Sequence, residues 1–327
     1  MTESLDLDGL QRLLWTFAGQ RVVTVAGRTG ILGRLADAPA SPEAVAADLG
    51  LNPLATGKVV RALHALGLVT AGDGDGYVVV DTVRRFFRSG DEDFTPFLEH
   101  SHSMYEAWGA NLEPWLRGDG WESPERTPER TRRFGEAMRA MGTQVARRVA
   151  AALDLESVAR VLDVGGGWGQ YARAICDRAP AARATVLDIP QVAEAASASV
   201  AGTGLEGRLS WIGGDYLETD FGTGYDLVLL ANILHQELAP DAAELVRRAA
   251  AATEPGGRVA VVDFRIDDAK REHLLGTLFA INMRSFGDTY SEPELRGWME
   301  AAGLVDIQRT DIGPDRWLIT GSRPRSF

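Results

Sequence analysis

The stretch of sequence that decides the fold is RVLDVGGGWG, residues 160–169. Its first half, RVLDV, is a short apolar segment typical of a strand that is covered on both faces. The strand runs directly into a glycine loop at residues 165–169, and a helix is expected after it. Glycines in such a loop allow a tight turn and a close approach of the backbone to a ligand. This unit predicts the first crossover of an α/β sheet.

Four more short apolar segments follow at regular intervals, separated by helical segments. They are ATVLD (184–188), RLSWIGG (208–214), YDLVLLA (225–231) and RVAVVDF (258–264). The alternation predicts an α/β fold with a doubly wound, mostly parallel, Rossmann-like sheet. The C-terminal residues predict one more helix and two strands, joined by a turn at Gly313 and Pro314. We expect these two strands to form an antiparallel hairpin at the edge of the sheet.

The N-terminal part of the chain is mostly helical in its pattern. Ser41 and Asn52 are each followed by proline, an arrangement that favours a capped helix start at both places. The segment LVTAGDGDGYVVV, residues 68–80, then predicts a hairpin with a Gly/Asp turn. The order helix, helix, two-stranded wing predicts a winged-helix domain. Residues 1–90 carry nine Lys/Arg and nine Asp/Glu, so this domain lacks the basic surface that DNA binding requires.

Composition and charge exclude several classes of protein. The 327 residues carry a formal net charge of −12, which disfavours nucleic acid as a partner. Cys176 is the single cysteine, so no disulfide framework or cysteine-based zinc site is expected. The first residues, MTESLDLDGL, lack the basic region of a signal peptide, and no apolar run approaches the length of a membrane span. We therefore expect a soluble, cytoplasmic protein without membrane or metal partners.

Two acidic residues flank the glycine loop in a way that favours a nucleoside ligand. Asp188 ends the second strand, 21 residues after Gly167, where a carboxylate can accept hydrogen bonds from ribose hydroxyls. This layout suits dinucleotides and S-adenosylmethionine alike. Asp163, just before the glycines, would repel a pyrophosphate but suits a cationic group such as the amino group of a methionine moiety.

Five motifs in order resemble the family of plant caffeate-type and bacterial natural-product O-methyltransferases. They are VLDVGGGWG, LDIP, GDY, LLANILHQ and EPGGRVAVVDF. The resemblance implies S-adenosylmethionine as cofactor, S-adenosylhomocysteine as its product, and an N-terminal winged-helix domain that forms a homodimer. It implies cofactor binding by Asp163, Gly165, Gly167, Asp188, Asp215, Tyr216 and Asn232, with Asp188 at the ribose and the Asp215–Tyr216 pair at the adenine.

The expected domains follow from this resemblance and from the shift in composition near residue 155. Residues 1–90 would form the winged-helix dimerisation domain, and residues 91–155 a helical connector and substrate lid. Residues 156–327 would form the S-adenosylmethionine-binding catalytic domain.

His235 is the candidate catalytic residue. It follows the strand YDLVLLA at the carboxyl end, where ligands bind in open α/β sheets. An imidazole there can take a proton from a substrate hydroxyl while a methyl group moves from sulfonium to oxygen. Asp263 ends the next strand and can orient that imidazole. The family usually has a glutamate in place of Asp263.

Further departures from the family pattern surround the histidine. Gln236 and Glu237 follow it, where the family often has Asp-Trp, and Ala231 stands where a basic residue is expected. A second orienting glutamate is replaced by Thr289, with Asp288 beside it. These departures weaken the expectation of ordinary phenol methylation more than that of cofactor binding.

Two helices are expected to line the acceptor pocket. One carries His102, Tyr105 and Trp108, and the other carries Phe279, Asn282, Met283 and Phe286 at the spacing of one helix face. His100 and His102 lie two residues apart and do not share a helix face, which argues against a metal site.

The sequence therefore predicts a methyltransferase that acts on a hydroxyl group of a small aromatic secondary metabolite. One alternative is a carbon acceptor, such as an enolisable keto acid or an electron-rich ring. Another is a relative that does not methylate and uses the bound cofactor as an electrostatic scaffold.

Overall fold

A computed structural model describes residues 6–72, 74–90, 92–122, 125 and 127–325. The chain divides into two compact units, Met1–Glu125 and Arg126–Phe327. The division into three parts, with boundaries near residues 90 and 155, stays a prediction. Among the described helices, none is both long and apolar enough to cross a membrane.

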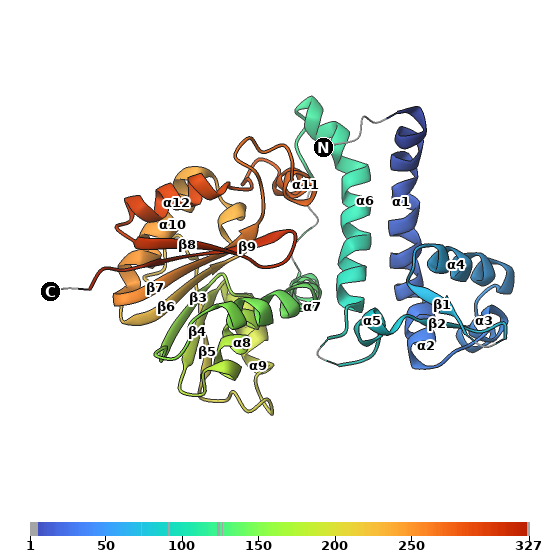
Figure 1. Cartoon of the computed structure of the whole chain (residues 1–327), viewed down its shortest axis with the longest axis horizontal. Helices are drawn as coiled ribbons and strands as arrows, with labels where there is room; N and C mark the ends of the chain where they lie inside the picture. Colours follow the sequence, from blue (N-terminus) through green and yellow to red (C-terminus); the bar gives the residue numbers. More distant parts are fainter. Residues whose placement is uncertain (1–5, 73, 91, 123–124, 126, 326–327) are drawn as a thin grey trace. The chain divides into compact units, whose positions relative to one another are not determined.

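The first unit contains six helices, a short 3₁₀ turn and a hairpin in its described residues (Figure 1). They are α1 (Leu7–Arg28), α2 (Ile31–Asp37), α3 (Pro42–Leu49), α4 (Pro53–Ala65), β1 (Val69–Ala71), β2 (Tyr77–Val79), α5 (Asp81–Arg84), η1 (Arg85–Phe87) and α6 (Thr95–Arg117). Ser41 and Asn52 cap α3 and α4 by accepting from the N–H groups of Ala44 and Ala55. The order of two helices and a two-stranded hairpin predicted from the sequence is confirmed.

The second unit is built on a seven-stranded sheet with the order β5-β4-β3-β6-β7-β9-β8. Its strands are β3 (Arg160–Val164), β4 (Arg183–Asp188), β5 (Leu209–Gly213), β6 (Tyr225–Ala231), β7 (Thr253–Phe264), β8 (Val305–Asp311) and β9 (Arg316–Ser322). The strands from β5 to β7 pair in parallel, and β9 and β8 add antiparallel pairs at the edge. The doubly wound α/β sheet and its antiparallel edge are confirmed.

Helices cover both faces of this sheet (Figure 1). The helices α7 (Pro128–Ala152), α8 (Gln170–Arg178) and α9 (Pro190–Ala198) lie on one face, and α10 (Ala239–Ala252) and α12 (Glu292–Ala301) lie on the other. Successive residues of a strand serve opposite cores: Leu227 packs with Val149 and Ile175, whereas Val228 packs with Leu245 and Leu295. The remaining helix, α11 (Leu274–Met283), contacts the short 3₁₀ helix η2 (Leu234–Gln236). The carboxyl ends of β3, β4, β6 and β7 therefore meet at one edge of the sheet.

The loop after β3 closes over a buried carboxyl group. Asp163 has no exposed surface, and its Oδ2 accepts from the N–H of Ala172 in the first turn of α8, at 3.2 Å. A Cβ atom on Gly166 would lie 2.5 Å from the carboxyl carbon of Asp163, so only glycine fits there. Burial raises the pKa of Asp163 to about 7, and the nearby charge of Asp188 acts in the same direction. The glycine loop after β3 therefore packs on the carboxyl group of Asp163, whose protonated, neutral form is favoured by burial.

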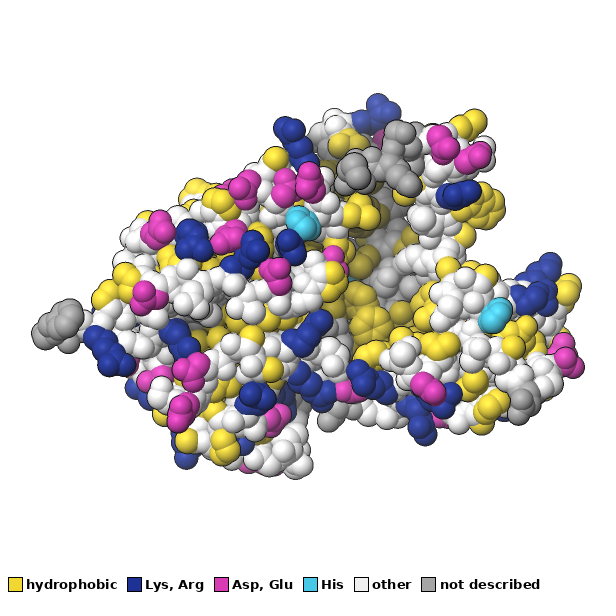
Figure 2. Space-filling model, viewed as in Figure 1, with side chains coloured by type: hydrophobic (Ala, Val, Ile, Leu, Met, Phe, Trp, Pro, Cys, Tyr) yellow, Lys and Arg dark blue, Asp and Glu magenta, His cyan; other side chains and the backbone are white. Residues whose placement is uncertain are grey.

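Charged side chains of both signs are interspersed over the face of the molecule shown in Figure 2.

The packing of α7 on the glycine loop depends on one glycine. A Cβ atom at Gly135 would lie 2.2 Å from Cζ3 of Trp168, and the Trp168 ring is buried. We expect Gly135→Ala to lower the free energy of unfolding by about 1–3 kcal/mol, because overpacking outweighs the helix propensity of alanine. Gly297→Ala on α12 is the control, since its Cβ atom would meet open space. It should stabilise the protein by up to about 1 kcal/mol. Urea unfolding of both variants measures the contrast, and a stabilised Gly135→Ala would contradict it.

Asp163 makes a definite contribution to the pH dependence of stability. The unfolded chain releases this proton near pH 4, whereas the folded chain holds it until about pH 7. A raised folded-state pKa favours the unfolded state as the pH rises through this window, so stability falls. Relative to the wild type without ligand, Asp163→Asn should therefore gain about 2–3 kcal/mol in unfolding free energy between pH 5 and pH 8. Asp177→Asn, at an exposed position on α8, is the control. If the unfolding free energies of Asp163→Asn and the wild type change in parallel between pH 5 and pH 8, the Asp163 carboxyl group does not cause the loss of stability with rising pH.

Candidate active site

His235 and Asp263 lie in direct contact at the carboxyl edge of the sheet. His235 is in η2, just after β6, and Asp263 is near the end of β7. The Nδ1 atom of His235 lies 2.6 Å from Oδ1 of Asp263, and both residues are buried. The N–H of Phe264 donates to the same Oδ1 at 2.7 Å. Because β6 and β7 are parallel neighbours, residues 28 positions apart in sequence meet at one place.

Aromatic rings enclose the imidazole. The ring of Phe279 from α11 meets the His235 ring edge-on at 4.8 Å, and Phe264 does so at 5.6 Å. Phe264 and Phe279 stack on each other at 3.8 Å. The backbone of the segment between α11 and α12 packs against the other side of His235. A Cβ atom on Gly287 in this segment would lie 2.0 Å from the carbonyl oxygen of His235. The histidine is thereby fixed in position and shielded from water.

The glycine loop and the end of β4 are tied together by Asp188. Its Oδ2 accepts from the N–H of Gly167 at 2.8 Å, and its Oδ1 accepts from the N–H of Ile189 at 2.8 Å. Gly167 has a φ of +57°, and a Cβ atom there would meet nothing within 4 Å. Gly165 has a φ of +65°, but its Cβ atom would clash with Ile233 at 2.5 Å. Gly167 therefore presents its backbone to open space, and Gly165 provides the close packing beneath the loop.

Asn232 links the end of β6 to α8. It has a left-handed backbone with a φ of 56°, and its Nδ2 donates to the hydroxyl of Tyr171 at 2.8 Å. Burial raises the pKa of Tyr171 to about 12, so this phenol stays neutral. Tyr171 was not among the residues expected from the sequence, because an aromatic residue at the start of a helix gives no sign of a polar role.

Asp215 and Tyr216 form a turn after β5. Oδ1 of Asp215 accepts from the N–H of Leu217 at 2.8 Å, and Arg248 donates to the carbonyl groups of Tyr216 and Leu217. The Tyr216 hydroxyl donates to Oε1 of Glu237 at 2.5 Å. Burial raises the pKa of both groups. Glu237, which departs from the family pattern, thus connects the loop after β5 to the loop after β6.

The acceptor residues predicted on the second helix lie only partly as expected. Phe279, Asn282 and Met283 are on α11, and all three are half-buried. Phe286 is not on their helix face: α11 ends at Met283, and Arg284 has a φ of 59°. Phe286 is exposed, so the expected helical spacing from 279 to 286 is wrong at its last member.

The residues predicted on the first helix belong to the other unit. His102, Tyr105 and Trp108 lie on α6. Within that unit His102 contacts Arg21 of α1 through Nδ1 at 2.5 Å, and the Arg21 guanidinium lies 4.5 Å from the centre of the Tyr105 ring. Their place in an acceptor pocket stays a prediction.

The residues considered as a second orienting carboxylate have other partners. Oδ2 of Asp288 pairs with Nζ of Lys270 at 2.8 Å, and the Thr289 hydroxyl donates to the carbonyl of Gly276 at 3.3 Å. Asp263 is therefore the carboxylate that contacts His235.

Several buried polar atoms at this edge lack a hydrogen-bond partner within the described part of the chain. They are Oδ1 of Asp163, Oε1 of Gln170, Oδ1 of Asn232, Oδ2 of Asp263, and Nε and Nη1 of Arg316. Unsatisfied buried polar atoms are costly, and their concentration around an open glycine loop is typical of a ligand cradle. Orphaned acceptors beside the loop fit the ammonium and hydroxyl donors of S-adenosylmethionine. Asp163 lies beneath the loop, so its direct contact with the amino group stays a prediction.

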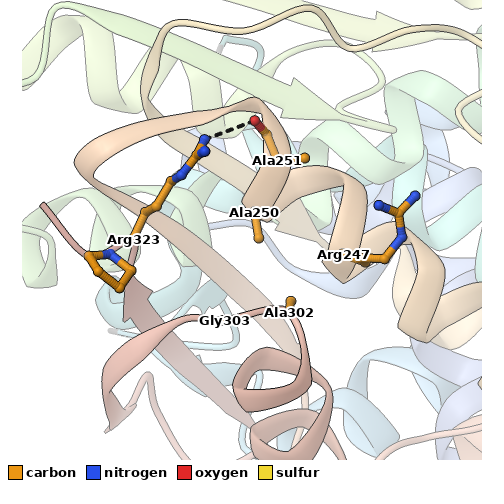
Figure 3. A pocket seen from close by; sticks show the side chains of 7 residues that line it. Arg247, Ala250, Ala251, Ala302, Gly303 and Arg323 are labelled. Atoms are coloured by element: carbon orange, nitrogen blue, oxygen red, sulfur yellow. Dashed lines mark hydrogen bonds between the residues drawn. The ribbon is translucent and has the colours of Figure 1, made fainter. Parts of the chain in front are cut away.

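A hollow elsewhere in the second unit offers no comparable chemistry. It has a volume of about 340 Å³ and lies between α10, the end of α12 and the end of β9 (Figure 3). Arg323 on its wall donates to the carbonyl of Ala251 at 3.0 Å. Ala251 lies two residues before Thr253, the first residue of β7, whereas Asp263 lies near the other end of this strand. This hollow is therefore at the opposite edge of the sheet from His235.

Comparison with known proteins identifies the family. Residues 99–304 match the family model for the O-methyltransferase domain. The chain is 28% identical over 304 residues to 3-hydroxy-5-methyl-1-naphthoate 3-O-methyltransferase from Streptomyces sahachiroi, covering 88% of this chain and 86% of that protein.

Two solved structures share the fold. The S-adenosylmethionine-dependent methyltransferase SibL in its apo form is 27% identical, with a TM-score of 0.76 over 98% of this chain and 100% of that one. Human N-acetylserotonin methyltransferase in complex with SAM has a TM-score of 0.85 at 23% identity, over 99% of this chain and 100% of that one. The chain belongs to the O-methyltransferase domain family, and it is an S-adenosylmethionine-dependent O-methyltransferase.

Proposed function

We propose that this enzyme methylates a hydroxyl group of a small aromatic secondary metabolite, with His235 as the general base. The observation that carries this proposal is the buried contact of 2.6 Å between His235 and Asp263, beside the glycine loop. The naphthoate methyltransferase named above supports an aromatic acceptor.

The hydrogen bonds of Asp263 fix the tautomer of the imidazole. Because the Phe264 N–H already donates to Oδ1, this oxygen is an acceptor, and Nδ1 of His235 must be the donor facing it. Nε2 is then the basic nitrogen of the ring. Asp263 acts as a positioning residue, and it also stabilises the imidazolium that forms when Nε2 takes a proton.

The remaining residues divide between the cofactor and the acceptor. Asp188, Gly167 and Asn232 would hold S-adenosylmethionine, with Asp215 and Tyr216 at the adenine. When bound, this cofactor supplies a methyl group on a sulfonium that a nucleophilic oxygen can displace. Phe279, Asn282 and Met283 would contact the acceptor from α11, and the buried walls around His235 keep water from competing for the proton.

The test of this function is a screen of hydroxylated aromatic acids, quinones and flavonoid-type phenols with S-adenosylmethionine. A mass gain of one methyl group identifies the acceptor, and NMR of the product shows whether oxygen carries it. A product methylated on carbon would replace the proposal by the alternative acceptor chemistry. Bound cofactor without any methylated product would favour the non-methylating alternative.

For the acceptor so identified, His235→Ala should lower kcat by about 10²- to 10⁴-fold, because the hydroxyl loses its proton acceptor. The affinity for S-adenosylhomocysteine should stay nearly unchanged. Asp263→Asn should reduce kcat less, since an amide oxygen can still accept from Nδ1. Initial rates and isothermal titration measure the two effects separately. Turnover by His235→Ala within a few-fold of the wild type would remove this residue from the chemistry.

We further infer that the N-terminal unit forms the contact of a homodimer. The first half of α1 carries a series of exposed large apolar side chains, namely Leu7, Leu10, Leu13, Leu14, Trp15 and Phe17. Apolar surface that is contiguous on one helix is a mark of a protein–protein contact. In a twofold dimer the same patch serves both subunits.

A dimer with this contact should have twice the 35.3 kDa mass of the chain in light scattering at micromolar concentration. Trp15→Glu should shift the protein toward the monomer, because it places a charge in a desolvated contact. Leu54→Glu, at an exposed apolar position on α4, should leave the mass unchanged. A monomeric wild type would contradict the dimer, and a dimeric Trp15→Glu would contradict this contact.

A further inference from the structure

Arg316, the first residue of β9, places a buried cation in the active-site cluster. Only 8% of its surface is exposed. It pairs in register with Phe264 of β7, and its guanidinium carbon lies 3.2 Å from the centre of the Phe264 ring. Phe279 stacks on that same ring at 3.8 Å and meets His235 edge-on. At these distances the guanidinium and Phe279 must occupy opposite faces of Phe264. Phe264 also meets the His235 ring edge-on at 5.6 Å, so one ring separates Arg316 from the imidazole.

Stacking satisfies the face of the guanidinium but not its edge. Nε and Nη1 are both buried and have no hydrogen-bond partner among the described residues. Burial lowers the pKa of Arg316, yet an arginine remains charged in a protein. A buried charge with two unused donors is costly unless something pairs with it.

The charged groups that face Arg316 do not supply the missing partner. Asp263, Tyr171 and Asp315 are close enough to favour its charge, and Arg148 of α7 opposes it. Oδ1 of Asp263 is already used by His235 and by the Phe264 N–H, and its Oδ2 is itself unpartnered. Arg309 on the neighbouring strand is different: its guanidinium pairs with Glu292 at 2.7 Å and with Asp311 at 3.3 Å.

We propose that Arg316 binds a carboxylate group in the active site through a charge-assisted hydrogen bond from its unpartnered Nε or Nη1 donor. This inference rests on the proposed function for the identity of the ligands. Two sources can supply the group: the amino-acid tail of the cofactor, or an aromatic acceptor that is itself a carboxylic acid. The Nε–H and Nη1–H groups leave different edges of the guanidinium, so each offers one charge-assisted hydrogen bond to a carboxylate oxygen. A phosphate dianion carries about twice the charge of a carboxylate and would be repelled more strongly by Asp188 and Asp263 at the same edge, so a singly charged anion is favoured.

The experiment uses binding rather than turnover. Arg316→Met keeps an apolar stem on Phe264 but removes the donors, and Arg316→Lys keeps the charge but replaces the planar guanidinium by an ammonium group. Arg309→Met is the control. It also removes a guanidinium near an aromatic ring, 5.9 Å from the centre of Trp317, but this guanidinium already pairs with Glu292. Circular dichroism and thermal melting establish that each variant is folded.

The full-length variants are titrated with S-adenosylhomocysteine, and with 5′-methylthioadenosine, which lacks the amino-acid tail. They are also titrated with 3-hydroxy-1-naphthoate and its methyl ester in the presence of S-adenosylhomocysteine.

If the cofactor supplies the carboxylate, Arg316→Met should weaken S-adenosylhomocysteine by about tenfold or more and leave 5′-methylthioadenosine unchanged. If the acceptor supplies it, the loss should appear for the naphthoate and not for its ester. Arg316→Lys should fall between the wild type and Arg316→Met in either case. The proposal is overturned if Arg316→Met binds all four ligands with the affinity of the wild type. It is also overturned if the wild type binds no naphthoate and Arg316→Met binds S-adenosylhomocysteine as tightly as the wild type does.

Failure of the proposed function would look different. It would appear as a wild type that binds S-adenosylhomocysteine, with affinity that depends on Arg316, but that methylates no hydroxyl group.

Discussion

The active site depends on the parallel pairing of β4, β3, β6 and β7. Parallel strands deliver their carboxyl ends to a single edge, so every loop that leaves that edge enters the same space. The register sets the details: Val164 of β3 pairs with Leu230 of β6, and Ala231 pairs with Val262 of β7. Residues that follow these pairs, among them His235 and Asp263, are then close without any direct link between them in sequence. A slip of one residue in β7 would turn Asp263 to the other face of the sheet and break the contact with the histidine.

The same edge concentrates buried polar groups, which an apolar sheet otherwise excludes. Asp163 is neutralised by its raised pKa, whereas Asp263 is satisfied on one oxygen by two N–H donors. Arg316 retains its charge and rests on an aromatic face. Each group carries a free-energy cost in the empty fold, and a polar ligand is able to recover part of that cost. A site built in this way is preorganised for its ligand at the expense of some stability.

Much of the fold could be predicted from the sequence because it depends on short-range patterns. The segment YDLVLLA matches β6 in full, and Ser41 and Asn52 cap the helices that they were expected to begin. The contact between His235 and Asp263 could be anticipated because both residues follow neighbouring strands. Phe286 shows the limit of a periodic pattern: the left-handed backbone at Arg284 ends the helix, and apolar spacing does not reveal it.

The residues that were missed act through tertiary contacts with no local signature. Arg316 begins β9, which lies between β7 and β8, and its sequence neighbours give no sign that it stacks on Phe264 of another strand. Gly287 lies in an ordinary polar turn, yet its missing side chain is what lets the backbone press against His235. Glu237 takes the place of a family tryptophan, and its role appears only when the loop after β5 brings Tyr216 to it. Such residues become visible once the sheet has brought distant loops together.

The loss of a second orienting carboxylate changes the electrostatics of this site more than its geometry. Asp263 alone holds the imidazole, while Asp288 pairs with Lys270 and Thr289 bonds to the backbone of α11. A second carboxylate beside His235 would add negative charge to the same buried region. In this chain a cation, Arg316, is instead buried on the ring of Phe264, which itself contacts His235. Arg316 therefore offsets part of the carboxylate charge around the histidine, so an anionic ligand is opposed less than it would be in a site with two carboxylates and no such cation.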